Sequence, residues 1–203
     1  MNQRLRNIFN STGQADRERA KFLSRVLGIF SEQIVSAWTR DERSPYENCG
    51  RPTIKTGEGD RGYTLDFTLR ERATGKVYVG EMKCEIEFQN FKFFVLEDAS
   101  QLDHHKKPAF EAFLRAARPT GDQTVFVKKN SIDTHGAILI WGAVTPEGRD
   151  GAIKAKGFHD VLSVEEICAD MASWNCARYA ALIEQRQTWC NELFTGLLKG
   201  RAS

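Results

Sequence analysis

Residues 63–87, YTLDFTLRERATGKVYVGEMKCEIE, contain the pattern that decides the fold of this chain. From Tyr63 to Arg70, apolar and polar residues alternate, as expected for a β-strand with one buried face. The segment 73–76, ATGK, has the composition of a hairpin turn, and a further strand is expected from Val77 to about Glu87. The two strands should therefore pair side by side.

The second of these strands changes character halfway along one of its faces. That face begins with valines and continues with Glu81, Lys83, Glu85 and Glu87. Burying such charges without partners is costly. Either the strand emerges into solvent, where the charges form exposed salt bridges, or it enters a cleft where a metal ion holds the carboxylates together.

A lone acid on the neighbouring strand, Asp66, supplies a partner for these charges. If the two strands pair around the turn, Asp66 and Glu81 lie near each other on adjacent strands. Two carboxylates and a backbone carbonyl form a minimal site for Mg²⁺, with water as the remaining ligands. Lys83 shares the face of Glu81, so its ammonium group could orient or deprotonate a water that attacks a phosphodiester. The pattern favours a metal-dependent phosphodiesterase.

Asp66, followed after fourteen residues by Glu81-Met82-Lys83, resembles the motif of the PD-(D/E)xK nuclease superfamily. The resemblance implies an α/β fold with a restriction-endonuclease-like core, a mixed central sheet flanked by helices in the order αβββαβ. It also implies that Asp66, Glu81 and the carbonyl of Met82 bind the metal and that Lys83 is catalytic. Leu65 stands where the family name has a proline, and members of the family often lack that proline.

The resemblance adds residues outside the two strands. Glu32, on the expected first helix, is the counterpart of an acid that many members add to the catalytic metal site. Gln101 could match an accessory glutamine that some members use. The implied cofactor is Mg²⁺ or Mn²⁺, and the implied activity is that of an endo- or exodeoxyribonuclease. The implied partners are DNA and, as in many enzymes of this fold, a second copy of the chain.

The rest of the chain is expected to complete a single domain over residues 15–203, after a flexible lead-in of residues 1–14. Helices are expected from about Ala15, from Ser100 to Ala117 with a start or kink at Pro108, and from Glu165 to Leu198 as one element or two, opened by a Ser163/Glu166 capping box. Further strands are expected near Thr53–Thr56, at Val125–Val127 and, buried on both faces, at Ala137–Val144. Loops are expected at 40–52 and after Val144.

The composition is that of a soluble globular protein, with 203 residues, 41% hydrophobic, 28% charged and a net charge of +2. So small a charge gives little support for a surface that coats itself in nucleic acid. The five cysteines contain no CxxC pair, which disfavours a zinc ribbon or a redox motif. Without a run of ~20 apolar residues or the apolar core of a secretory signal, a cytoplasmic location is expected.

Lysines outside the motif are candidates for contacts with backbone phosphates, although each could equally be an ordinary surface residue. They are Lys106, Lys107, Lys128, Lys129, Lys154 and Lys156. The adjacent His104 and His105 would point about 100° apart on a helix, so they are not expected to share a metal ion. The alternative to a nuclease is a non-catalytic nucleic-acid-binding or assembly protein that retains the fold.

Overall fold

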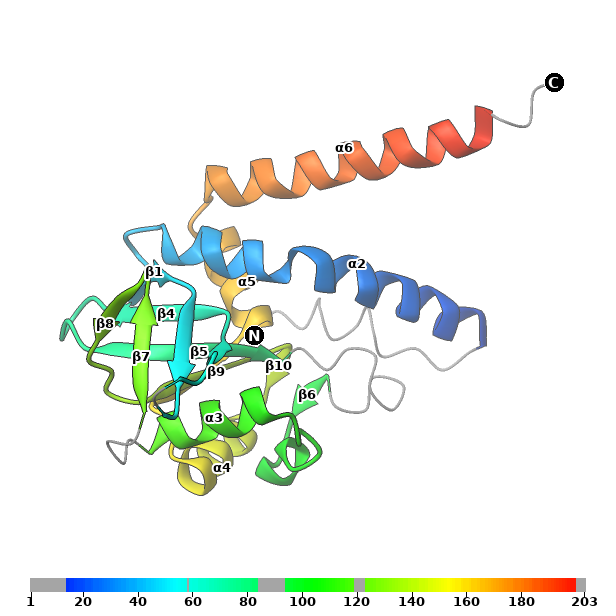
Figure 1. Ribbon diagram of the computed structural model, residues 1–203. Helices are drawn as coiled ribbons and strands as arrows, with labels where there is room; N and C mark the ends of the chain where they lie inside the picture. Colours follow the sequence, from blue (N-terminus) through cyan, green and yellow to red (C-terminus); the bar gives the residue numbers. More distant parts are fainter. Residues whose placement is uncertain (1–13, 58, 84–93, 119–122, 200–203) are drawn as a thin grey trace.

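A computed structural model describes residues 14–57, 59–83, 94–118 and 123–199. The protein has an α/β architecture, in which a mixed five-stranded sheet lies between helices and a four-stranded antiparallel sheet stands beside it (Figure 1). Residues 1–13, which make up nearly all of the expected lead-in, lie outside the described residues, as do residues 84–87 of the expected motif strand.

The central sheet has the strand order β1-β4-β5-β9-β11. Its strands are β1 (Tyr46–Gly50), β4 (Phe67–Glu71), β5 (Val77–Lys83), β9 (Ala137–Trp141) and β11 (Asp160–Ser163). β1, β4 and β5 are antiparallel neighbours, whereas β9 and β11 run parallel to β5. Gly75, with a φ of 73°, makes the turn between β4 and β5, and its N–H donates to the carbonyl of Glu71 (2.8 Å).

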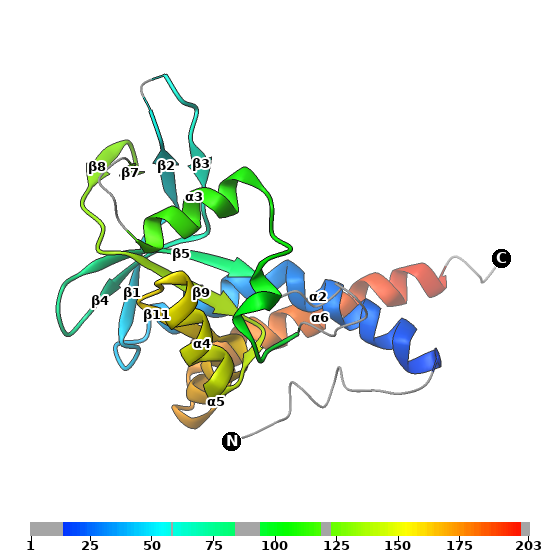
Figure 2. The same cartoon turned by 90° about the horizontal axis from the view of Figure 1, so that it is seen from below.

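The four-stranded sheet, which we name the side sheet, has the order β3-β2-β7-β8. Its strands are β2 (Pro52–Lys55), β3 (Tyr63–Thr64), β7 (Thr124–Val127) and β8 (Asn130–Ile132). β2 and β3 form a hairpin that projects from the body of the molecule (Figure 2). A short parallel pair, β6 (Val95–Leu96) and β10 (Ala143–Val144), follows the end of β9.

Helices cover both faces of the central sheet. They are α2 (Gln14–Thr39), the 3-10 helix η1 (Ala99–Leu102), α3 (Pro108–Ala117), α4 (Pro146–Lys156), α5 (Val164–Ser173) and α6 (Ala177–Lys199). α2 and α5 lie on one face, α3 and α4 lie on the other, and α6 packs along α2 (Figure 1). No helix within the described ranges is long and apolar enough to span a membrane.

β9 lies inside the sheet and is buried along its whole length. Ile138 and Ile140 pack in the cluster that contains α2 and α5, whereas Leu139 and Trp141 pack in the cluster that contains α3 and α4. Because helices cover both faces, this strand is apolar throughout and shows no alternation. The expected buried strand is confirmed, although it ends at Trp141, and β10 is a separate strand.

The first strand of the central sheet lies in a segment for which the sequence predicts a loop. Residues 40–52 contain β1, and the strand expected near Thr53 belongs to the side sheet as β2. β1 is an edge strand, so it carries solvated polar residues such as Glu47, which pairs with Arg70 (2.6 Å). Tyr46 anchors it through a hydroxyl that donates to Asp160 (3.1 Å). The polar composition of an edge strand explains the wrong prediction.

The segment after Val144 is also ordered, so the prediction of a loop there is wrong. Its α4 helix has Thr145 as N-cap, whose side chain accepts from the N–H of Gly148 (3.0 Å), and Pro146 in its first turn. It ends at Gly157, which has a φ of 83°. These capping signals were present in the sequence, but the glycines and lysines between them suggested a loop.

Other expectations concern where helices begin and end. α3 starts at Pro108, which decides between a start and a kink. Ser163 caps α5 by accepting from the N–H of Glu166 (3.3 Å), but the Glu166 side chain pairs with Arg149, so the expected reciprocal capping box is absent here. The last helical stretch is two helices, separated around Asn175, which has a φ of 51°.

Candidate metal centre

Asp66 lies where the chain leaves the side sheet and enters the central sheet. The sequence predicts one continuous strand over residues 63–70, but β3 and β4 are separate strands joined at Leu65 and Asp66. Leu65 is fully buried, and Asp66 turns toward β5, where its Oδ2 accepts from the N–H of Met82 (2.9 Å). The change of sheet therefore brings this acid to the motif strand.

Glu81 lies on β5 beside Asp66. The register of β4 and β5 pairs Phe67 with Gly80, so Asp66 lies opposite Glu81 one step further on. The Glu81 side chain is only 9% exposed, and its Oε1 accepts from Nζ of Lys83. Burial raises the pKa of the Glu81 carboxyl; the positive charge of Lys83 opposes this rise, and the negative charge of Asp66 adds to it.

The second carboxylate oxygen of Glu81, Oε2, is buried and lacks a hydrogen-bond donor among the described residues. A buried carboxylate oxygen without a donor costs free energy. An electron-pair acceptor placed against Oε2 would satisfy this atom.

Lys83 ends β5, and its ammonium group stays beside the two residues before it. Nζ contacts the Glu81 carboxylate and the carbonyl oxygen of Met82 (3.3 Å). Three consecutive residues therefore present a carboxylate, a carbonyl and an ammonium group at one end of the strand. Asp66 joins this group through the N–H of Met82 and lies opposite Glu81.

Among the described residues, Arg51 is what connects Glu32, on α2, to this group. One guanidinium nitrogen of Arg51 lies 3.2 Å from Oδ1 of Asp66, and the other lies 3.8 Å from Oε2 of Glu32. Arg51 directly precedes β2, and no motif or alternation pattern distinguishes it from other surface arginines. A cationic group thus bridges two carboxylates that the resemblance assigns to the metal.

The donor set suits a hard divalent cation. Asp66 and Glu81 offer carboxylate oxygens and Met82 offers a carbonyl, which are the ligand types that Mg²⁺ and Mn²⁺ prefer. The unpartnered Oε2 of Glu81 fits a metal ligand. Within the described ranges, however, no group of three or more His, Cys, Asp or Glu side chains is close enough to hold a metal ion. Water and a substrate phosphate would have to complete the coordination.

Gln101 has its side chain occupied elsewhere. Its Oε1 accepts from the N–H groups of Glu97 (2.6 Å) and Asp98 (2.9 Å), and its Nε2 donates to the carbonyl of Val95 (2.9 Å). The amide closes the turn at the start of η1. Its position is explained by this structural role, and the structure does not bring it to Asp66 and Glu81 through any described contact.

The candidate phosphate-binding lysines lie in three separate places: the turn after β7, the segment before α3, and α4, which carries Lys154 and Lys156. Lys128 and Lys129 form the turn between β7 and β8 with φ values of 49° and 70°, and both are exposed. Lys106 and Lys107 are exposed just before α3. Lys156 is held by Asp103 (2.6 Å). Lys128 and Lys129 are therefore the pair that belongs to the side sheet, whose strand β2 directly follows Arg51.

A surface cavity of about 200 Å³ lies elsewhere, between the end of α2 and the start of α6. Arg40, Arg43 and Arg178 line it, and none of the candidate site residues does. Arg43 is already paired with Asp41 (2.7 Å), and its pairing lowers the pKa of that carboxyl.

Comparisons of the chain with protein-family models, with curated proteins and with solved structures gave no match. The function is therefore inferred from the geometry of the site.

Proposed function

We propose that this chain is a metal-dependent nuclease that hydrolyses phosphodiester bonds in DNA, with Mg²⁺ or Mn²⁺ as cofactor. The observation that carries the proposal is the contact of Asp66 with the end of β5, where Glu81, Met82 and Lys83 are consecutive residues. The buried, unpartnered oxygen of Glu81 supports it, because a protein keeps such an atom at a cost to stability.

The order of elements supports a restriction-endonuclease-like core. In chain order α2, β1, β4, β5, α3 and β9 run as helix, three strands, helix and strand, with β6 and η1 before α3 and β7 and β8 after it as additions. The three strands are antiparallel neighbours, and β9 is added parallel to β5. β2 and β3 are then an insertion between the first and second core strands. This arrangement agrees with the αβββαβ order that the motif implies.

The residues have distinct roles in the proposed reaction. Asp66, Glu81 and the Met82 carbonyl would hold the metal, which when bound polarises the phosphate and lowers the pKa of a water ligand. Lys83 is placed to donate to a phosphate oxygen or to orient the attacking water, because its Nζ already lies between Glu81 and Met82. Arg51 must release Oδ1 of Asp66 before that oxygen can serve as a ligand.

Cleavage of supercoiled and linear DNA in Mg²⁺ and in Mn²⁺ tests the proposal. Asp66→Asn and Lys83→Met should each abolish cutting, while circular dichroism and thermal melting remain those of a folded protein. Lys76→Met, in the exposed turn between β4 and β5, is a matched control and should cut like the wild type. Wild-type activity in both site variants would remove the assignment.

A non-catalytic nucleic-acid-binding or assembly protein is the second candidate, and one observation favours it. The Arg51 guanidinium lies where it neutralises both Glu32 and Asp66, as in a site that has lost its metal. Titration with Mn²⁺ separates the two functions. A nuclease should bind Mn²⁺ in a manner that depends on Asp66, whereas a remnant site should give no binding at millimolar metal.

A further inference from the structure

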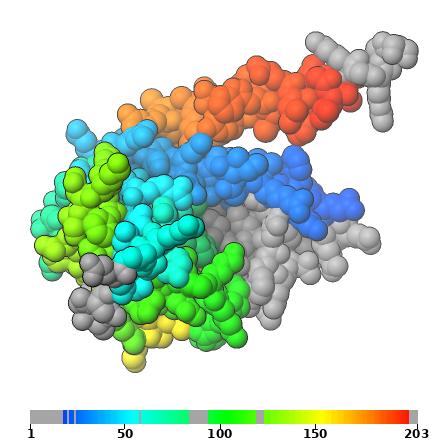
Figure 3. Space-filling model, in the orientation of Figure 1, coloured from blue at the N-terminus to red at the C-terminus, as the bar shows by residue number. Residues whose placement is uncertain are grey.

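The side sheet has one packed face and one open face. Along β2, Pro52 and Ile54 are buried against the α3 side of the core, whereas Thr53 and Lys55 point the other way and stay partly exposed. β7 alternates in the same manner, with Val125 inward. Figure 3 shows β2 and β7, in cyan and lime, at the surface of the molecule. On this open face Thr64 is exposed, and Thr53, Lys55 and Phe126 are half-buried.

The strand register shows which side chains share the open face. Thr53 lies between Thr64 on β3 and Phe126 on β7, and the two threonine hydroxyls are 3.4 Å apart. Nζ of Lys55 lies 5.4 Å from the centre of the Phe126 ring. The face therefore combines hydroxyl groups, an aromatic ring and a cation, a combination found where proteins track a nucleic-acid strand.

The same face leads directly to the candidate metal centre. Alternation along β2 places Arg51 with Thr53 and Lys55, and alternation beyond β3 places Asp66 with Thr64. The exposed Lys128, in the turn after β7, lies at the edge of this face: a Cβ built on Gly50, next to Arg51, would lie 4.0 Å from its Cε. A nucleic-acid strand lying along this face would reach Asp66 without a change of direction.

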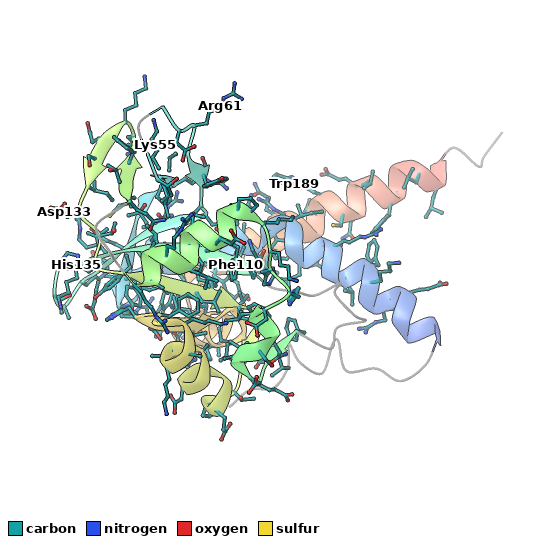
Figure 4. All side chains as sticks on the ribbon, turned by 60° about the horizontal axis from the view of Figure 1, so that its bottom comes forward. Lys55, Arg61, Phe110, Asp133, His135 and Trp189 are labelled. Atoms are coloured by element: carbon teal, nitrogen blue, oxygen red, sulfur yellow. The ribbon has the colours of Figure 1, made fainter. Side chains whose placement is uncertain are left out.

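The charge of the face suits phosphate. Arg51, Lys55 and Lys128 are positive, and Arg61 stands on the projecting hairpin with Lys55, as Figure 4 shows. Asp60, near the hairpin tip, is an acid on this surface, and hydrogen bonds from the N–H of Gly62 and from Thr56 lower the pKa of its carboxyl. Arg51 is already paired with Asp66 and Glu32, so Lys55, Arg61 and Lys128 are the cations most available to phosphate.

We propose that this surface, formed by Arg51, Thr53, Lys55, Thr64, Phe126 and Lys128, binds the sugar-phosphate backbone of DNA and guides it to the metal centre. We name it the outer face of the side sheet. The destination of the strand rests on the proposed nuclease function, but the binding does not, because it needs neither metal nor cleavage.

Fluorescence anisotropy with a short labelled DNA, in EDTA and across a salt series, tests the surface. Lys55→Gln and Lys128→Gln should each raise the Kd several-fold and reduce the salt slope by about 1, whereas Lys76→Gln, in the turn between β4 and β5, should leave both unchanged. Single-stranded and duplex probes of equal length identify which form the face prefers. Binding that both outer-face variants leave at the wild-type Kd, or no wild-type binding at low salt, would overturn the proposal.

The same experiment separates this inference from the proposed function. Asp66→Asn should retain DNA binding, since it removes a negative charge from the end of the face. If the metal centre is wrong and the outer face is right, DNA binds and is not cut. If the outer face is wrong and the metal centre is right, the lysine variants cut DNA as the wild type does.

A second surface rests on a different observation, the apolar side chains of α2 and α6 that no described residue buries. Both helices extend beyond the sheet on the same side of the molecule (Figures 1 and 3). They run side by side, with the rings of Phe22 and Phe194 6.2 Å apart. Large apolar residues between 43% and 78% exposed lie along them, namely Phe22, Ile29, Trp189, Leu193, Phe194, Leu197 and Leu198.

The size of this surface indicates what kind of partner it requires. At about 150–250 Å² for a whole aromatic side chain and somewhat less for leucine, the exposed parts amount to roughly 700 Å². The largest apolar patch of a typical monomer is about 300–600 Å², whereas a stable protein interface buries about 800 Å² on each partner. The two helices therefore expose nearly enough area for one side of a dimer.

We infer that a second copy of this chain covers the α2–α6 surface. Two antiparallel helix pairs related by a twofold axis would form a four-helix bundle, and each would bury the stripe of the other. The opposite side of α6, which carries Glu184, Thr188, Glu192 and Thr195, would face solvent.

Sedimentation equilibrium over a concentration series tests the dimer. The wild type should sediment as a dimer, Leu193→Glu should sediment as a monomer, and Thr195→Glu, on the polar side of the same helix, should remain a dimer. Thermal melting checks that both variants are folded. A wild type that stays monomeric at every concentration, or that instead binds lipid vesicles through this surface, would overturn the inference.

Discussion

Replacing Arg51 with methionine should strengthen the binding of divalent metal to this protein. The guanidinium group is 3.2 Å from Asp66 and 3.8 Å from Glu32, so it competes with a metal for those carboxylates. Its side chain is 57% exposed, and each such contact is therefore worth only about 0.2–1 kcal/mol. Losing both should favour metal binding by about 1 kcal/mol, or roughly fivefold in Kd.

Isothermal titration with MnCl₂, in the absence of nucleic acid, measures this change. Arg70→Met is the matched control, because Arg70 is paired with Glu47 on the same sheet and does not contact the site. The control should bind Mn²⁺ with the wild-type Kd. An Arg51→Met variant that binds Mn²⁺ no more tightly than the wild type would refute the idea that Arg51 competes for the site.

Three further changes have expected outcomes. Glu81→Gln should bind no Mn²⁺, yet melt a few degrees higher than the wild type near neutral pH, because the folded state raises the pKa of the Glu81 carboxyl. The wild type loses stability as the pH rises through that pKa, so the two melting temperatures should converge below about pH 4. A variant that melts lower than the wild type at neutral pH would contradict this. Gly148→Ala should destabilise the fold by about 2–4 kcal/mol in urea unfolding, since its Cβ would lie 2.1 Å from the carbonyl oxygen of Leu96. Gly151→Ala in the same helix should instead stabilise the fold by about 0.5–1 kcal/mol, because the nearest atom to its Cβ is the backbone nitrogen of Ala99, 4.0 Å away. Equal effects of the two substitutions on stability would contradict the close packing at Gly148.

The grouping of Asp66 with Glu81 could be predicted because it depends on local features. Alternation defines β5, and the glycine at the turn fixes the pairing of Phe67 with Gly80. These two facts place Asp66 opposite Glu81 without any knowledge of the rest of the fold. The buried strand β9 could be predicted for a similar reason, since its apolar run is unbroken.

Arg51 could not be predicted because its position depends on two sheets. The chain leaves β1, forms β2 and β3 in the side sheet, and returns to the central sheet at Asp66. Only this excursion brings Arg51 against an acid fifteen residues later. An alternation pattern shows which way a side chain points, but it does not show that the chain changes sheet.

The missed elements were hidden by their composition. β1 is a polar edge strand, and α4 contains Gly148, which approaches the carbonyl of Leu96 too closely for any larger residue. In both places tertiary packing determines the secondary structure and overrides the local propensity of the residues. Gln101 shows the converse, since a residue matched to a family role is used to close a turn.

The position of bound Mn²⁺ tests the central claim most directly. Crystals of the protein soaked in MnCl₂ should show an anomalous peak at about 2.0–2.3 Å from carboxylate oxygens of Asp66 and Glu81, with Arg51 moved away from Asp66. A peak that also contacts Glu32 would place that acid in the metal site. A well-ordered site without Mn²⁺ at millimolar concentration, with Arg51 still against Asp66, would contradict the claim that these residues form a metal centre.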